Sequence, residues 1–160
     1  MQCMASASAE RERPRAVALA SQLRATAAGL IDTIECIQPE VWDRVRKPGE
    51  WSPGKDAEHV TDAVALHLWH VCDALGLAHP DPPQIERARL TALRSQVEIL
   101  ATLRSRVAHA AALIEDLTDA QLEALDRNSR PIANIIQRPL IRHLGKHHEE
   151  IEKKLRAVRH

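Results

Sequence analysis

Aromatic residues and cysteine are scarce in this chain. Phenylalanine and tyrosine do not occur and tryptophan occurs 3 times, which leaves few rings on which single-stranded bases could stack. The 3 cysteines, Cys3, Cys36 and Cys72, form neither a CxxC pair nor the even, closely spaced set of a disulfide framework. The composition therefore excludes a disulfide-stapled fold and favours a reducing cytoplasm.

An excess of charge of either sign is also absent. Lysine and arginine number 22, aspartate and glutamate also 22, so no overall field attracts nucleic acid or an anionic membrane. No apolar run approaches the roughly 20 residues of a membrane span, and the N-terminal residues lack the apolar segment of a secretory signal. We expect a cytoplasmic protein with a small-molecule substrate and no nucleic-acid or membrane partner. We expect a disordered tail over residues 1–12 and one domain over 13–160.

The first half of the chain predicts two long helices. From about Arg13, apolar residues recur at three- and four-residue steps, the spacing of one helix face; they are Leu23, Ala27, Leu30, Ile34 and Ile37. A break rich in proline and glycine follows, with a short helical turn around Val41 and Trp42. Ser52 has the character of an N-cap with Pro53 in the first helical position. The second helix should begin there and run to about Leu75, before Gly76.

The second half predicts two more long helices. The third runs from about Glu86 to Asp116, and its expected buried face is Leu93, Val97, Leu100, Leu103, Val107, Ala111 and Ile114. Thr118 and Gln121 form a capping box for a brief helix. The fourth runs from about Ile132 to the C-terminus, where Pro139 kinks it or marks its real start. Three pairs support its last turns at i,i+4 spacing; they are Glu149 with Lys153, Glu150 with Lys154 and Glu152 with Arg156.

Four long helices without an alternating strand pattern predict an all-α fold, a single four-helix bundle with short helical turns in its connections.

Histidines on the last helix have metal-ligand spacing. His143 and His147 are four residues apart, which puts them about 40° apart around a helix axis and lets both imidazoles reach one ion. His148 lies about 140° from His143, so we expect it to be solvated at the edge of that face. With 9 histidines in the chain, surface coincidence is the alternative explanation for the pair.

A third ligand must come from another helix, and His59 is the candidate. It shares a face of the second helix with Ala63, Leu66 and His70, so it should point inward, where an imidazole needs a hydrogen bond or a metal. His70 lies about 16 Å further along the axis; it cannot bind the same ion but can line the same cavity, with a hydrogen-bonded core histidine as the alternative.

Two other metal-site patterns are absent from the sequence. Leu144 follows His143 where a zinc protease has its glutamate, and no glutamate stands three residues before a histidine as in di-iron bundles. A mononuclear site with three imidazoles remains, and such a site keeps a position open for substrate.

The segments "EWSPGKDAEHV" and "RHLGKHHEEI", in this order and separation, resemble the DinB-like four-helix bundle superfamily. The resemblance covers nearly the whole chain. It implies that His59, His143 and His147 bind a divalent metal, and it suggests a homodimer. The characterised enzymes of that family include thiol-dependent S-transferases and a mycothiol-dependent maleylpyruvate isomerase.

The leading hypothesis is therefore a metal-dependent S-transferase or isomerase that activates mycothiol, bacillithiol or glutathione. A thiol that coordinates a metal loses its proton, and the thiolate can attack an electrophile bound alongside. Asp62 can orient the ligand, unless it is an ordinary surface acid, and Trp51 and Trp69 can wall the pocket, unless they pack in the core. Zinc or nickel is the expected metal, with iron next.

Two alternatives stay open. One is a metal-binding bundle without catalysis, such as a stress-response or sensing protein. The other is a structural or interaction bundle whose histidines bind no metal.

Overall fold

The computed structural model describes residues 13–159, and their fold is all-α, as predicted. The long helices are α1 (Pro14–Glu35), α3 (Pro53–Leu75) and α4 (Gln96–Glu115). A fourth helical run is continuous through α6 (Ile132–Ile135), the π-helical segment η2 (Ile136–Arg142) and α7 (His143–Val158). Two short helices, α2 (Pro39–Trp42) and α5 (Asp119–Glu123), lie in connections. The predicted tail over 1–12, with Cys3, lies outside the described residues.

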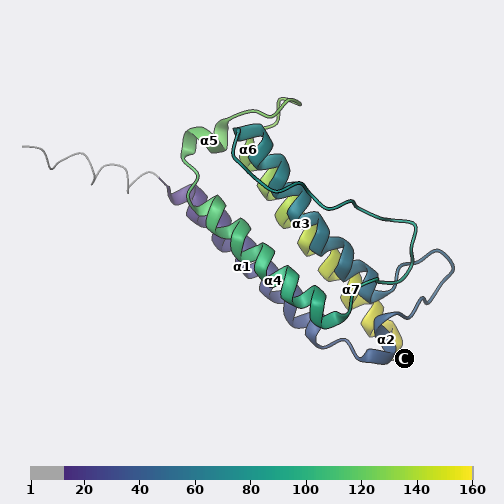
Figure 1. Ribbon diagram of the computed structural model, residues 1–160. Helices are drawn as coiled ribbons and strands as arrows, with labels where there is room; N and C mark the ends of the chain where they lie inside the picture. Colours follow the sequence, from purple (N-terminus) through teal and green to yellow (C-terminus); the bar gives the residue numbers. More distant parts are fainter. Residues whose placement is uncertain (1–12, 160) are drawn as a thin grey trace, which may run out of the picture.

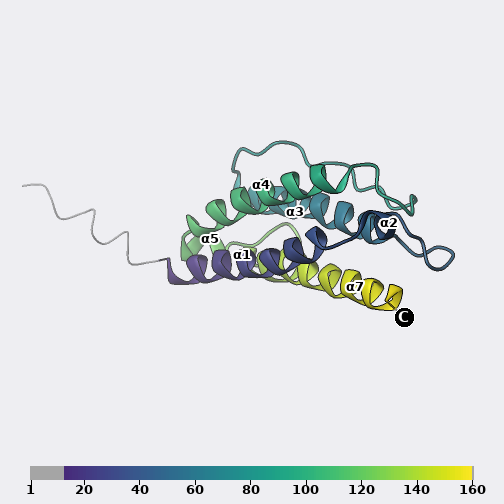
Figure 2. The same cartoon turned by 90° about the horizontal axis from the view of Figure 1, so that it is seen from below.

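The four long helical runs pack as a ring of neighbours. α1 and α3 each lie against both α4 and α7 (Figures 1 and 2). The apolar face predicted for the first helix is confirmed, because Leu23, Ala27, Leu30 and Ile34 are at most 1% exposed and Ile37, just past the helix end, is 2% exposed. Burying each large aliphatic side chain contributes roughly 1.5–3 kcal/mol, so this shared core holds the bundle together.

The bounds predicted for the second long helix are confirmed by its caps. The Ser52 hydroxyl accepts a hydrogen bond from the backbone N–H of Lys55 at 3.1 Å, and Pro53 begins α3. Gly76 ends it with φ of 68°, a conformation that glycine adopts without a steric penalty. All residues from Ser52 to Thr61 are buried, so the polar groups in this part of α3 face other elements of the protein.

The predicted start of the third helix at Glu86 is wrong, because α4 begins at Gln96. A capping box fixes that start: Ser95 accepts from the N–H of Glu98, and the Glu98 carboxylate accepts from the N–H of Ser95. Leu93 and Val97 were predicted to be buried, but they are 67% and 77% exposed. The rest of that predicted face, Leu100, Leu103, Val107, Ala111 and Ile114, is buried.

Residues 76–95 form an irregular segment that runs back along α3 (Figure 1). The Glu58 carboxylate accepts hydrogen bonds from the N–H groups of Leu93 and Arg94, at 2.9 and 3.0 Å. These bonds occupy backbone donors that a helix would use, so this segment packs across α3 instead of extending α4. The same bonds lower the pKa of Glu58 although burial acts to raise it.

The last helix differs from a regular α-helix where Pro139 was predicted to disturb it. Pro139 lies inside η2, where the helix widens instead of ending. Lys154 was predicted to pair with Glu150 at i,i+4 spacing, but its pair is a buried one: Lys154 is 6% exposed and its ammonium contacts the carboxylate of Asp56 on α3. None of the described helices is long and apolar enough to cross a membrane.

Candidate metal centre

The three predicted ligands come together between α3 and α7. One nitrogen from each of His59, His143 and His147 lies within 4.8 Å of the other two. The Nε2 atoms of His143 and His147 are 3.0 Å apart, and the His59 ring centroid lies 5.4 Å and 4.9 Å from theirs. Three imidazoles therefore converge on one point, as the four-residue spacing and the inward face of α3 predicted.

The protonation of these imidazoles suits a divalent cation. Burial, together with the neighbouring His147, lowers the pKa of His59 to about 4 and that of His143 to about 3. Both rings are therefore neutral at pH 7 and keep a lone pair, which a metal ligand requires. The Nδ1 atom of His59 is buried without a hydrogen-bond partner among the described residues. Neutral, closely grouped nitrogens with an unpaired buried acceptor are a donor set that fits zinc, nickel or iron.

Asp56 orients the third imidazole. Its Oδ1 lies 3.2 Å from Nδ1 of His147, and a ring that donates its Nδ1–H to a carboxylate presents the Nε2 lone pair on its other side. The second Asp56 oxygen contacts the ammonium of Lys154. Asp56 and Lys154 are 3% and 6% exposed, so a buried ion pair fixes the side of His147 that faces the other two histidines.

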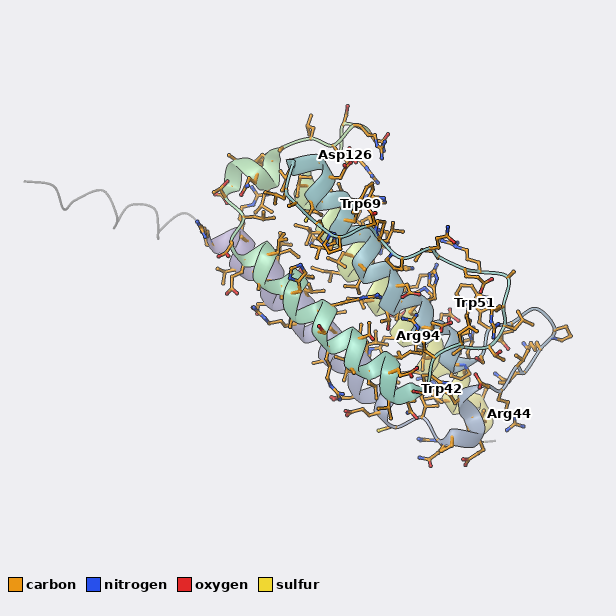
Figure 3. All side chains as sticks on the ribbon, viewed as in Figure 1. Trp42, Arg44, Trp51, Trp69, Arg94 and Asp126 are labelled. Carbon is orange, nitrogen blue, oxygen red and sulfur yellow. The ribbon has the colours of Figure 1, made fainter. Side chains whose placement is uncertain are left out.

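Trp51 packs against two rings of the centre, and its expected place in the wall of the pocket stays a prediction. Its ring centroid lies 4.9 Å from that of His59 and 6.5 Å from that of His147, and it is stacked on the His147 ring. Its Nε1–H donates to the carbonyl of Arg87 at 3.3 Å, which ties it to the irregular segment 76–95. Trp69 is near the α6 end of α3, away from Trp51 (Figure 3), and packs against His70 with ring centroids 5.4 Å apart.

Asp62 is part of a different network. Its two oxygens pair with Arg94 at 2.8 Å and with Arg106 at 2.9 Å, which ties the end of segment 76–95 and α4 to α3. It shares a cavity of about 290 Å³ with His59, while the carboxylate that contacts an imidazole of the centre is Asp56. The role expected of Asp62 in orienting a ligand stays a prediction.

His70 and His148 lie apart from the three converging rings. His70 lines a cavity of about 330 Å³ with Asp73, Asp126 and Arg130, and burial lowers its pKa. His148 was expected to be solvated, but its Nε2 lies 2.7 Å from the hydroxyl of Thr33. Its ring is held between α7 and α1, because Gly29 leaves room for it: a Cβ on Gly29 would lie 3.2 Å from that ring.

His67 is a residue of this region that the sequence reasoning missed. Its ring packs edge-on against that of His143, with the ring centroids 5.7 Å apart. Its buried Nδ1 has no hydrogen-bond partner within residues 13–159. Burial lowers its pKa to about 4. The signal was present in the sequence, since His59, Ala63 and His67 follow one another at four-residue steps on α3.

A large open cavity adjoins the centre. Its volume is about 1210 Å³, and His59, His67 and His143 form part of its wall. The remaining wall comes from α1, from two further residues of α3, from residues 85 and 87, and from the α6, η2 and α7 run. A small molecule in this cavity would lie directly beside two of the three candidate ligands.

Comparison with known protein families gives a match. The family model described as the DinB superfamily matches residues 22–151, a range that contains all three converging histidines. No curated protein and no solved structure matches the chain.

Proposed function

Since the chain belongs to the DinB superfamily, we propose that it is a metal-dependent enzyme that transfers or adds a low-molecular-weight thiol to an electrophile. His59, His143 and His147 hold the metal, which is zinc or nickel, with iron as the next choice. The observation that carries this proposal is the convergence of three imidazole nitrogens within 4.8 Å beside a cavity of about 1210 Å³.

The chemistry expected from the metal is activation of the thiol. A divalent cation supplies the Lewis acidity that lets a thiol lose its proton at neutral pH. Three protein ligands leave a coordination position open for that thiol, as in catalytic zinc sites.

The protein residues prepare the centre for this role. Asp56 holds His147 with one nitrogen directed toward the other two rings. Trp51 shields His59 and His147 on one side and limits the access of water. These contacts keep the ligands oriented before the substrates bind.

The reactive thiol is supplied by a small molecule, such as mycothiol, bacillithiol or glutathione. Cys72 is fully buried, and burial raises the pKa of its thiol, which makes it a poor nucleophile. Cys36 lies at the C-terminal end of α1 and does not line the cavity beside the centre. An external thiol therefore fits the site better than either of these cysteines.

The test combines metal analysis with an assay. We expect the purified protein to contain one divalent metal per chain and to accelerate the reaction of one thiol of the panel with a generic electrophile. His143→Ala should lose both properties, while His148→Ala, which alters the neighbouring histidine and its contact with Thr33, should keep the metal.

Other outcomes would support the alternatives. Stoichiometric metal with no thiol-transfer rate above background would indicate a binding or sensing protein. Metal that is absent, or that persists in His143→Ala, would refute the proposed centre.

A further inference from the structure

We infer that the large cavity beside the three histidines binds a small organic anion, and that this anion is the second substrate of the centre. The role of the anion as a substrate rests on the proposed function, whereas its binding in the cavity does not. It rests on the charge of the cavity wall and on the place of the cations relative to His143.

The wall of the cavity is strongly cationic. It contains Arg87, Arg138, Arg142 and Lys146 but a single carboxylate, that of Glu149. Three positive charges in excess therefore face one cavity in a chain whose net charge is +0. A cavity lined by one sign of charge focuses the field and raises the local concentration of ligands of the opposite sign.

These cations lack protein carboxylates to neutralise them. Arg94 and Arg106 bind Asp62 elsewhere in the structure, whereas within residues 13–159 no ion pair involves the four cations of the cavity. Their guanidinium and ammonium groups are exposed and available to a ligand. Arginine binds carboxylate and phosphate oxygens through two parallel hydrogen bonds, which makes an acidic group the matching ligand.

The cations lie close to the centre along the last helix. Arg142 directly precedes His143, and Lys146 follows it by three residues, roughly 4.5 Å along the axis. Arg138 lies on η2, a wide helical segment of a type that is frequent at functional sites. An acidic group held between these side chains would leave the rest of a small molecule beside His143.

His67, on α3, is a further residue of the cavity wall. Its Nδ1 is buried and has no hydrogen-bond partner among the described residues. Its ring centroid lies 5.7 Å from that of His143. The Nδ1 nitrogen has almost no accessible surface, so it does not contact a ligand in the open cavity unless the side chain moves. The cavity therefore offers positive charge for an acidic group near the centre.

The test is direct binding to the purified full-length protein, measured by ligand-observed NMR. The probes are succinate, its neutral isostere succinamide, and glycerol 3-phosphate. We expect at least one anion to bind and succinamide to bind at least about tenfold more weakly, since loss of a charged contact costs about a factor of ten. The stronger of the two anions identifies carboxylate or phosphate as the preferred group. Equal binding of anion and amide, or no binding of any probe, would overturn the inference.

Matched variants separate the cavity from general surface charge. Arg87→Gln removes a cation of the wall, and Arg89→Gln removes an exposed cation two residues along that does not line the cavity. We expect the first, and likewise Arg138→Gln, to weaken anion binding about five- to tenfold, and the second to leave it unchanged. Glu149→Gln should strengthen binding, because it removes the only carboxylate of the wall. Equal effects of Arg87→Gln and Arg89→Gln would refute the site.

Metal content distinguishes failure of this inference from failure of the proposed function. Arg138→Gln should retain the metal of the parent protein. Metal without anion binding contradicts the anion site alone, and anion binding without metal contradicts the metal-dependent function alone.

Discussion

The Nδ1–H of His147 on α7 donates to Oδ1 of Asp56 on α3 across 3.2 Å. The partners are 91 residues apart in the chain, and each is placed by its own helix. The contact therefore links the position of one candidate metal ligand to the packing of α3 against α7. It also gives α3 two roles, because the same helix contributes His59 three residues further on.

The first prediction concerns this contact. Asp56→Asn should lower metal affinity by about tenfold or more, because an amide is a weaker acceptor for the imidazole N–H than a carboxylate. Metal titration of the stripped protein measures it. Asp62→Asn is the control and should keep the affinity, since its partners are Arg94 and Arg106.

Loss of stability could mimic this result, because Asp56→Asn leaves the ammonium of Lys154 buried without its carboxylate partner. Breaking a buried ion pair costs about 3–5 kcal/mol. The double variant Asp56→Asn, Lys154→Met removes the unpaired charge and should recover stability but not metal affinity. Recovery of both would show that Asp56 acts only through the fold.

The second prediction concerns pH. The pKa is about 4 for His59 and His67 and about 3 for His143 in the folded protein, below the ordinary value near 6.5. Below pH 6.5 the unfolded chain therefore binds more protons than the folded one. The free energy of unfolding of the metal-free protein should fall as the pH drops from about 6.5 toward 4.

Urea denaturation at pH 7 and pH 5 tests this dependence. His67→Asn should reduce it, because one of the three buried imidazoles is gone. His109→Asn, at an exposed position on α4, should leave it unchanged. Stability that is constant between the two pH values would contradict the burial of neutral imidazoles.

The third prediction concerns two glycines. A Cβ on Gly54, in the first turn of α3, would lie 2.6 Å from the ring of Trp42, whose side chain is buried. Gly54→Ala should therefore destabilise the protein by about 1–3 kcal/mol through overpacking. A Cβ on Gly145 would meet nothing closer than Thr26 at 3.9 Å. Gly145→Ala should be neutral or stabilising by up to about 1 kcal/mol. Thermal unfolding of both variants measures the two effects, and a Gly145→Ala variant less stable than Gly54→Ala would contradict the prediction.

The fourth prediction follows from the corrected start of α4. Val97 is 77% exposed and Leu103 is 0% exposed, although both share the apolar face predicted from the sequence. Val97→Lys should change the free energy of unfolding by less than about 0.5 kcal/mol, whereas Leu103→Ala should cost about 2–5 kcal/mol. A large effect of Val97→Lys in denaturant titrations would indicate that the N-terminal part of α4 is covered in solution.

Local signals predicted most of the fold. Ser52, Pro53 and Gly76 set both ends of α3 through backbone geometry that depends on neighbouring residues alone. The predicted third helix begins too early, because Leu93 continues the apolar spacing of the face, whereas the S-x-x-E pattern of Ser95 and Glu98 marks the true start of α4. The side chain of Glu58 binds the backbone of that segment, and this distant contact has no signature in the local sequence.

The candidate centre, like the fold, could be predicted from the sequence where the signal was local. The four-residue spacing of His143 and His147 is a property of one helix, and the convergence of His59 on them agrees with its inward face. The role of Asp56 depends on the distance between two helices, which no spacing within the chain reports. The buried pairing of Lys154 with Asp56 is beyond local spacing for the same reason, because the two residues are 98 apart in the chain.

The π-helical segment η2 determines the direction in which the candidate ligands of α7 face. A π turn holds more residues than an α turn, so each residue of excess rotates everything that follows by about 100° relative to a regular helix. Arg142 ends η2 and His143 begins α7, so the excess lies immediately before the ligands. Conversion of η2 to a regular α-helix, with no residue removed, would turn His143 and His147 away from His59 while leaving their mutual spacing intact. The direction in which the HxxxH pair faces is thus encoded upstream of it, in a stretch that contains no ligand at all.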